Sequence, residues 1–174
     1  MLIVTPLALG DMGVVVLWNL NYVGRHKNGA ELIMNVTLFT ESDDVPWEEL
    51  AQLFELAPLG KKRDPGKLQV AFQNSLHKCF AFHDGKLIGA GRALSDGVWR
   101  AAIYDVAVLP EYQGNGIGSK IIQHLIQAAN VDVIMLYAAP GKEPFYERFG
   151  FRKMKTAMAI MQNPEERRKK GFIE

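Results

Sequence analysis

The chain has 174 residues, of which 48% are hydrophobic and 22% charged, with 20 basic side chains against 19 acidic ones. This composition is typical of one compact soluble domain, and a net charge of +1 gives no electrostatic reason to expect binding to nucleic acid or to an anionic membrane. Because Cys79 is the single cysteine, an internal disulfide is excluded, and we expect a cytoplasmic protein.

The first 33 residues are apolar but interrupted, and we expect an extension of unknown role. Pro6 and Asp11 divide this segment, and its longest clean run, 12–18, is too short to span a bilayer. No lysine or arginine precedes that run, so a secretory signal is a poor match, and a leading strand packed on the domain is favoured. The expected regions are this extension at 1–33, a main domain at 34–162 and a charged helical tail at 163–174.

The pattern after Met34 predicts alternating strands and helices. Asp64-Pro65 is a helix start signal, and Asp44 followed by Pro46 is a similar one. Asp84-Gly85 is typical of a two-residue hairpin turn. The predicted elements of this half are a strand at 35–40, a helix after each start signal, a hairpin over 78–94 and a strand at 100–110.

Apolar residues recur at helical spacing over 117–129 and predict an amphipathic helix. The almost wholly apolar segment 131–139 predicts a strand buried on both faces. A short helix between Pro144 and Gly150 and a last strand at 151–161 complete the domain. The order of these elements predicts an α/β fold with a mixed sheet and helices on both faces.

Three glycines in five positions, Gly114, Gly116 and Gly118, lie between a strand and a helix N-terminus. Such a turn suits an anion, because successive amides and the helix dipole favour negative charge and glycine lets a phosphate approach. The order Gly118-Ser119-Lys120 does not fit a P-loop, and Ser119 replaces the third glycine of a dinucleotide fingerprint. A tight turn whose glycines serve packing alone is the alternative.

Two motifs together resemble those of the GCN5-related N-acetyltransferase (GNAT) family. Gln113-x-x-Gly116-x-Gly118 after "DVAVLPEY" looks like the pyrophosphate loop of that family, and "EPFYERFGF" at 143–151 looks like its "FYxxxGF" element. The resemblance covers about residues 34–161. It implies the GNAT acyl-CoA N-acyltransferase fold, a central, mostly antiparallel sheet with a splayed parallel strand pair. Segment 91–118 is most similar to bacterial relatives of the plant-type serotonin (arylalkylamine) N-acetyltransferases.

The implied function is transfer of an acetyl group from the cosubstrate acetyl-CoA to a primary amine, by direct attack in a ternary complex. In the family, loop amides hold the pyrophosphate and the end of the preceding strand pairs with the pantetheine arm. Carried over, the cofactor-binding residues are Gln113, Gly114, Asn115, Gly116, Ile117, Gly118 and Ser119 in the loop, and Val106, Ala107 and Val108 in the strand. The resemblance implies no metal.

Tyr146 matches the tyrosine of the family that donates a proton to the departing thiolate. Asp105, in the middle of its strand, is the candidate for gripping the acceptor ammonium or relaying its proton. The alternatives are a packing role for Tyr146 and a backbone-bonding role for Asp105.

The residues proposed for the acceptor pocket are Trp47, Phe54 and Tyr137. The expected partner is a small-molecule amine, with no nucleic acid and no membrane, and a homodimer is left open. The alternative function is a non-catalytic acetyl-CoA-binding sensor.

Overall fold

The structure is a computed structural model that describes residues 18–25, 31–57 and 62–174. The chain divides into two compact units, the first ending at Ile134 and the second spanning Met135–Glu174. This division differs from the expected boundaries after residues 33 and 162. Strand β2 (Glu31–Phe39) runs across the first of them, and much of the predicted extension, 1–17 and 26–30, lies outside the described residues.

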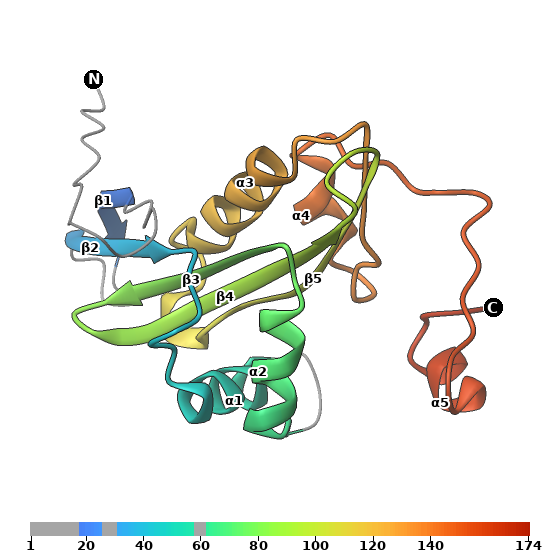
Figure 1. The fold of residues 1–174 in the computed structure, drawn as a ribbon, viewed down its shortest axis with the longest axis horizontal. Helices are drawn as coiled ribbons and strands as arrows, with labels where there is room; N and C mark the ends of the chain where they lie inside the picture. Colours follow the sequence, from blue (N-terminus) through green and yellow to red (C-terminus); the bar gives the residue numbers. More distant parts are fainter. Residues whose placement is uncertain (1–17, 26–30, 58–61) are drawn as a thin grey trace. The chain divides into compact units, whose positions relative to one another are not determined.

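Six strands form one sheet in the order β1-β2-β3-β4-β5-β6 (Figure 1). Neighbouring strands from β1 to β5 are antiparallel. Helix α3 (Ile117–Ala129) connects β5 to β6 as a crossover, the connection that joins parallel strands, so the sheet is mixed as predicted. Besides β2, the strands are β1 (Trp18–Arg25), β3 (His77–His83), β4 (Lys86–Ser95), β5 (Arg100–Val108) and β6 (Val133–Met135).

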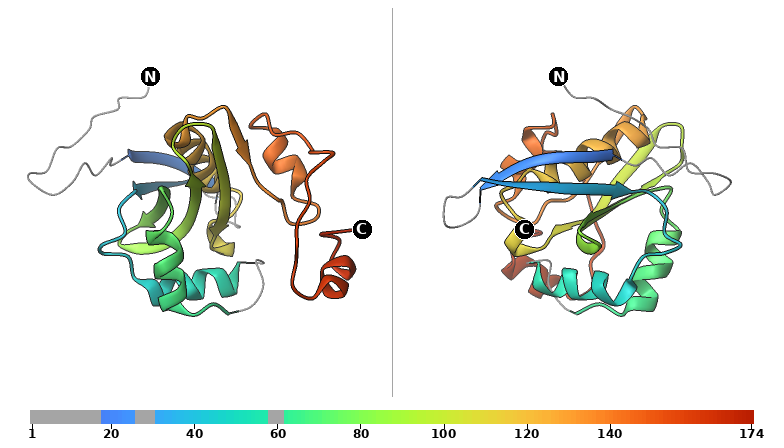
Figure 2. Two further views of the ribbon diagram at one scale, coloured as in Figure 1. Left: turned by 45° about the vertical axis from the view of Figure 1, so that its right-hand side comes forward. Right: turned by 90° about the vertical axis from the view of Figure 1, so that its left-hand side faces the viewer.

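Helices cover both faces of the sheet (Figure 2). Helices α1 (Trp47–Leu56) and α2 (Pro65–Gln73) lie on one face, and α3 lies on the other. The side chain of Asp64 accepts a 2.9 Å hydrogen bond from the Lys67 amide, which confirms the predicted start of α2. Within the described residues, every helix is too short or too polar to cross a bilayer.

The hairpin between β3 and β4 is confirmed with its turn. Asp84 and Gly85 have φ angles of +48° and +76°, the pair of left-handed residues that a tight hairpin turn requires. On the α1–α2 face the core contains Phe72 and Phe80, whose ring centroids are 5.2 Å apart. On the opposite face α3 buries Ile121, Ile122 and Leu125.

One predicted strand, 131–139, is much shorter than expected, and another, 151–161, does not form. Strand β6 covers only three residues of 131–139, and Val133 is 37% exposed, so the strand is not buried on both faces. No strand forms over 151–161, where Met158 and Ile160 are fully exposed. Side chains that favour β structure form a strand only beside a hydrogen-bonding neighbour, and no described residue of the second unit forms a strand beside this segment.

The second unit contains α4 (Glu143–Glu147) and α5 (Pro164–Lys169). Helix α5 confirms the predicted helical tail, and a 2.6 Å ion pair joins Arg168 to Glu165 within it. Asn163 occupies the predicted N-cap position, but its side chain makes no capping hydrogen bond because its backbone is left-handed, with φ +55°.

Close packing of α3 on the sheet depends on Gly91 in β4. A Cβ atom added at Gly91 would lie 2.6 Å from Ile121 Cγ2 and 3.3 Å from Val106 Cγ2, closer than carbon atoms pack. Glycine is therefore required here by the distance between helix and strand.

We expect Gly91→Ala to lower the free energy of unfolding by about 1–3 kcal/mol, because the added methyl group must displace α3 or Ile121. Denaturant titration followed by circular dichroism measures this change. The loss should shrink in an Ile121→Ala background, where the clashing methyl group is gone. An unchanged midpoint for the single variant would contradict the expectation.

Candidate functional site

The glycine-rich turn joins β5 to the N-terminus of α3. Gly114 and Gly116 have φ angles of +79° and +77°, left-handed conformations that a larger residue adopts only with strain. Gly116 is the N-cap residue of α3, so the turn ends where the helix dipole places partial positive charge. The predicted sequence of strand, glycine turn and helix is confirmed.

The backbone amides of this turn are available to a ligand. Among the described residues, none accepts a hydrogen bond from the amides of 114–119. A Cβ atom added at Gly114 would meet nothing within 4 Å, so the space beside it is open. The side-chain amide of Gln113 donates to the Val108 carbonyl at 2.9 Å and ties the turn to the end of β5. Unpaired amides at a helix N-terminus beside open space fit a pyrophosphate group.

A β-bulge interrupts β5 at Asp105. The register of β4 and β5 shifts by one residue between the pairs Ala90–Ala107 and Arg92–Tyr104, so that 105 and 106 together lie opposite Gly91. Asp105 has φ +56°, a left-handed backbone conformation in the middle of a strand. The bulge therefore gives Asp105 a side-chain direction that regular alternation along β5 would not.

Beyond the bulge, the backbone of β5 offers hydrogen-bonding groups on the edge away from β4. The Leu109 amide donates to the Ile88 carbonyl at 2.9 Å, so Leu109 and Ala107 face β4. Because this direction alternates along a strand, the backbone groups of Val106 and Val108 face the opposite edge. Strand β6 has three residues against nine in β5, and the bond from the Val133 amide to the Trp99 carbonyl lies at the other end of β5.

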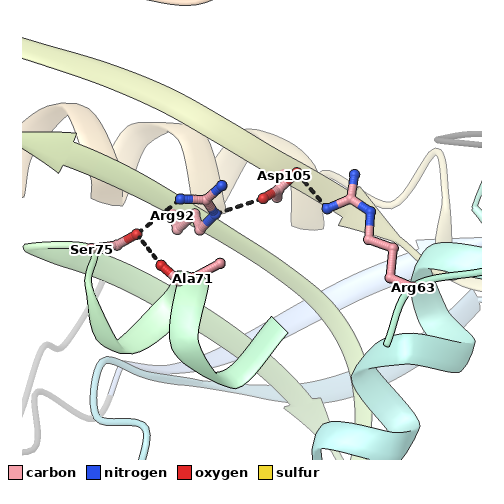
Figure 3. A network of polar contacts seen from close by, with 5 residues as sticks. All are labelled: Arg63, Ala71, Ser75, Arg92 and Asp105. Carbon is pink, nitrogen blue, oxygen red and sulfur yellow. Dashed lines mark hydrogen bonds and ion pairs between the residues drawn. The ribbon is translucent and has the colours of Figure 1, made fainter. Parts of the chain in front are cut away.

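Asp105 lies between two arginines (Figure 3). Arg63 Nη1 donates to Asp105 Oδ1 at 2.7 Å, and Arg92 Nε donates to Asp105 Oδ2 at 2.5 Å. Arg92 Nη1 also donates to Ser75 Oγ at 3.1 Å, and that hydroxyl donates to the Ala71 carbonyl at 2.8 Å. Both carboxylate oxygens of Asp105 therefore already accept hydrogen bonds, from side chains and not from the backbone.

Sequence reasoning missed Arg63 and Arg92. A signal was present for Arg92, since it interrupts the apolar segment 87–94 of β4, and an arginine in a buried strand needs an acidic partner. Arg63 gave no comparable signal, because it lies outside the regular elements and its partner is 42 residues away.

Two of the three aromatic residues predicted for the acceptor pocket, Trp47 and Phe54, belong to the packed face under α1 and α2. Phe54 is fully buried, and the guanidinium carbon of Arg63 lies 4.5 Å from its ring centroid. Trp47 is half-buried, with its ring 6.2 Å from those of Phe72 and Phe80. Phe54 is thus close to Asp105 through Arg63, whereas Trp47 packs on the neighbouring rings.

Tyr137 and Tyr146 belong to the second unit. Tyr137 lies two residues after the end of β6, not in the strand as predicted, and its exposed ring is 6.3 Å from Phe172. Tyr146 is half-buried in α4, with its ring 6.2 Å from Phe151. Burial raises the pKa of the Tyr146 phenol, which keeps the hydroxyl protonated at neutral pH.

Among the described residues, Cys79 and the potential metal ligands give no sign of a second site. Burial raises the pKa of the Cys79 thiol to about 12, so this cysteine is not a nucleophile. Within the described ranges, no group of three or more His, Cys, Asp or Glu residues could hold a metal. A cavity of 490 Å³ lies elsewhere, lined by residues of α1 and the β3–β4 turn such as Leu56 and Lys86, and it includes none of the predicted site residues.

Comparisons with known proteins identify similar sequences and folds. The model of the Acetyltransferase (GNAT) family matches residues 43–151. An uncharacterized N-acetyltransferase ycf52 of Gracilaria tenuistipitata var. liui is 32% identical over 135 residues, which cover 73% of this chain and 72% of that protein. The ycf52 protein of Pyropia yezoensis is 38% identical over 101 residues, covering 53% and 57%.

A solved structure is also similar to the chain. The probable acetyltransferase SA2161 of meticillin-resistant Staphylococcus aureus superposes with a TM-score of 0.61 at 26% identity, covering 72% of this chain and 99% of that one. The chain spans 57%, 61% and 27% of the lengths of three curated relatives that it matches, so these relatives contain sequence outside the shared region.

Proposed function

Because the chain belongs to the GNAT family of acetyltransferases, we propose that it transfers the acetyl group of acetyl-CoA to a primary amine. The observation that carries this proposal is the turn before α3, whose amides at 114–119 find no acceptor among the described residues. A turn of this kind holds the pyrophosphate of coenzyme A in the family. The amine attacks directly, which agrees with the inert thiol of Cys79.

The backbone supplies the cosubstrate site in this proposal. The amides that hold the pyrophosphate belong to Gly114, Asn115, Gly116, Ile117, Gly118 and Ser119. The backbone of Val106 pairs with the pantetheine amides, and the outward-facing Val108 amide faces the thioester oxygen, while the Val108 carbonyl accepts from Gln113. When bound, acetyl-CoA supplies an activated acyl group.

Two side chains take part in proton transfer in this proposal. An alkyl amine with a pKa near 10.4 is only about 0.1% neutral at pH 7, so the acceptor arrives as an ammonium and must lose a proton before it attacks. Asp105 holds this ammonium and passes its proton toward water. As the new C–N bond forms and the C–S bond breaks, Tyr146 donates a hydrogen bond and then a proton to the departing sulfur. The nitrogen loses its second proton as the amide forms, and this proton restores the Tyr146 hydroxyl through water. The raised pKa of Tyr146 keeps the hydroxyl protonated, so Tyr146 acts as a hydrogen-bond donor first and as a proton source second.

The acceptor proposed is an arylalkylamine. The similarity of segment 91–118 to arylalkylamine acetyltransferases supports this class, and so does the Phe54 ring, which shares a contact with Asp105. Arg63 connects the two, since its guanidinium contacts both Asp105 and the ring of Phe54. An aromatic ring and a carboxylate at this spacing suit a ligand with a ring and an ammonium.

A panel of amines tests the proposal with the full chain and acetyl-CoA. We expect release of free thiol with tryptamine and serotonin, and little with glucosamine 6-phosphate or a lysine-containing peptide. Acetylation of the sugar phosphate or the peptide alone would overturn the arylalkylamine assignment. Tight binding of acetyl-CoA without turnover of any amine would instead favour a sensor.

A further inference from the structure

We propose that Arg63 occupies the subsite that receives the ammonium group of the acceptor, so that the acceptor binds by displacing this side chain. The inference rests on the proposed function, in which Asp105 holds an ammonium. Arg63 Nη1 lies 2.7 Å from Asp105 Oδ1, and its guanidinium carbon lies 4.5 Å from the Phe54 ring centroid. One cationic group thus satisfies a carboxylate and an aromatic face together, as the ammonium end of an arylalkylamine would.

The two arginines beside Asp105 differ in how firmly they are held (Figure 3). The side chain of Arg92 is 15% exposed, and its second hydrogen bond, to Ser75, is supported from the backbone of α2. The side chain of Arg63 is 33% exposed, and its bond to Asp105 is its only side-chain hydrogen bond within the described part of the chain. Arg63 is therefore the partner that can be exchanged, while Arg92 fixes the carboxylate.

Charge balance requires an exchange. Two guanidinium groups and one carboxylate leave one net positive charge in this partly buried cluster. Adding an ammonium while Arg63 stays in place would bring a third cation against a single anion, whereas replacing Arg63 keeps the charge unchanged. Departure of Arg63 also uncovers the face of Phe54 that it contacts, which gives the ring of the acceptor a place to pack.

This arrangement makes Arg63 an internal competitor of the acceptor. Only the fraction of molecules in which Arg63 has left Asp105 can bind, so the apparent affinity is reduced by that fraction. Solvent reaches this pair from the side of Arg63, which is 33% exposed against 12% for Asp105, so the pair is partly screened and removing this competition should tighten binding by about threefold to fivefold. If Arg63 instead held an anionic group of the substrate, its removal would weaken binding.

The test is calorimetric titration of tryptamine into the full chain, with and without coenzyme A and in the absence of acetyl transfer. Arg63→Ala, and separately Arg63→Gln, should bind tryptamine about threefold to fivefold more tightly than wild type. Lys62→Ala is the matched control, because it removes a neighbouring exposed positive charge and leaves Asp105 untouched. The gain should disappear in Arg63→Ala/Asp105→Asn, which removes the carboxylate charge.

Equal or weaker binding by both Arg63 variants, or an equal gain in Lys62→Ala, would overturn the proposal, and so would the absence of tryptamine binding in every variant. The outcome is separable from that of the acetyltransferase assignment. Tighter binding without turnover would leave the subsite in place and refute the activity, whereas turnover with unchanged affinity would do the reverse.

Discussion

Tyr146→Phe is expected to lower kcat about 10²-fold while the Kd for acetyl-CoA stays within about threefold of wild type. The substitution removes one hydroxyl and keeps the ring, which packs in the second unit beside Phe145 and Phe151. The lost hydrogen bond meets the negative charge that grows on sulfur, so it is strongest in the transition state. In the proposed site, backbone groups of other residues hold the pyrophosphate and the pantetheine, so we expect only a small change in affinity.

The measurement is steady-state release of thiol at saturating acetyl-CoA, with calorimetric titration of acetyl-CoA alongside. A kcat near the wild-type value for Tyr146→Phe would mean that water protonates the thiolate and that Tyr146 has a packing role.

Gly116→Val is expected to weaken acetyl-CoA binding at least tenfold. The residue has φ +77° at the N-cap of α3, so a branched side chain strains the backbone at the point where the phosphate groups approach. The strain alone costs about 1–2 kcal/mol of stability, and the loss of affinity is a separate effect. Titration of acetyl-CoA by calorimetry measures it.

The variant Gly85→Val is the control that distinguishes backbone strain from a direct effect on the cosubstrate site. Gly85 has φ +76°, nearly the same backbone conformation, but it lies in the β3–β4 turn with nothing within 4 Å of an added Cβ. Both variants should lose similar stability in thermal unfolding, and only Gly116→Val should lose affinity. Equal affinities for the two would remove the turn before α3 from the cosubstrate site.

Local signals predicted much of the first unit. The Asp84-Gly85 turn, the Asp64 cap and the apolar face of 117–129 each depend on residues a few positions apart, and all three are confirmed. The glycine turn was predicted for the same reason, because the strand, the glycines and the helix are contiguous in the chain.

Contacts between residues far apart in the sequence could not be predicted. The arginines on Asp105 come from β4 and from the segment before α2, and no pattern along the chain pairs them with the bulge. The apolar segment 151–161 has side chains that favour a strand, but strand formation requires a neighbour that composition does not supply. The roles of Tyr146 and Asp105 stay predictions that depend on the family resemblance, and Tyr146→Phe tests the first of them.

Asp105 has a left-handed backbone conformation. This conformation restricts which amino acids can replace Asp105, both in a saturation library and among homologues. Aspartate, asparagine and glycine adopt φ near +56° most readily, whereas glutamate and every β-branched residue pay a conformational penalty unrelated to charge. Backbone geometry alone therefore disfavours glutamate in such a library, so a failed Glu variant says nothing about proton transfer. An invariant aspartate among relatives would likewise combine three selective pressures, which are bulge geometry, the ion pairs with Arg63 and Arg92, and chemistry. Asparagine keeps the first and removes the charge on which the other two depend.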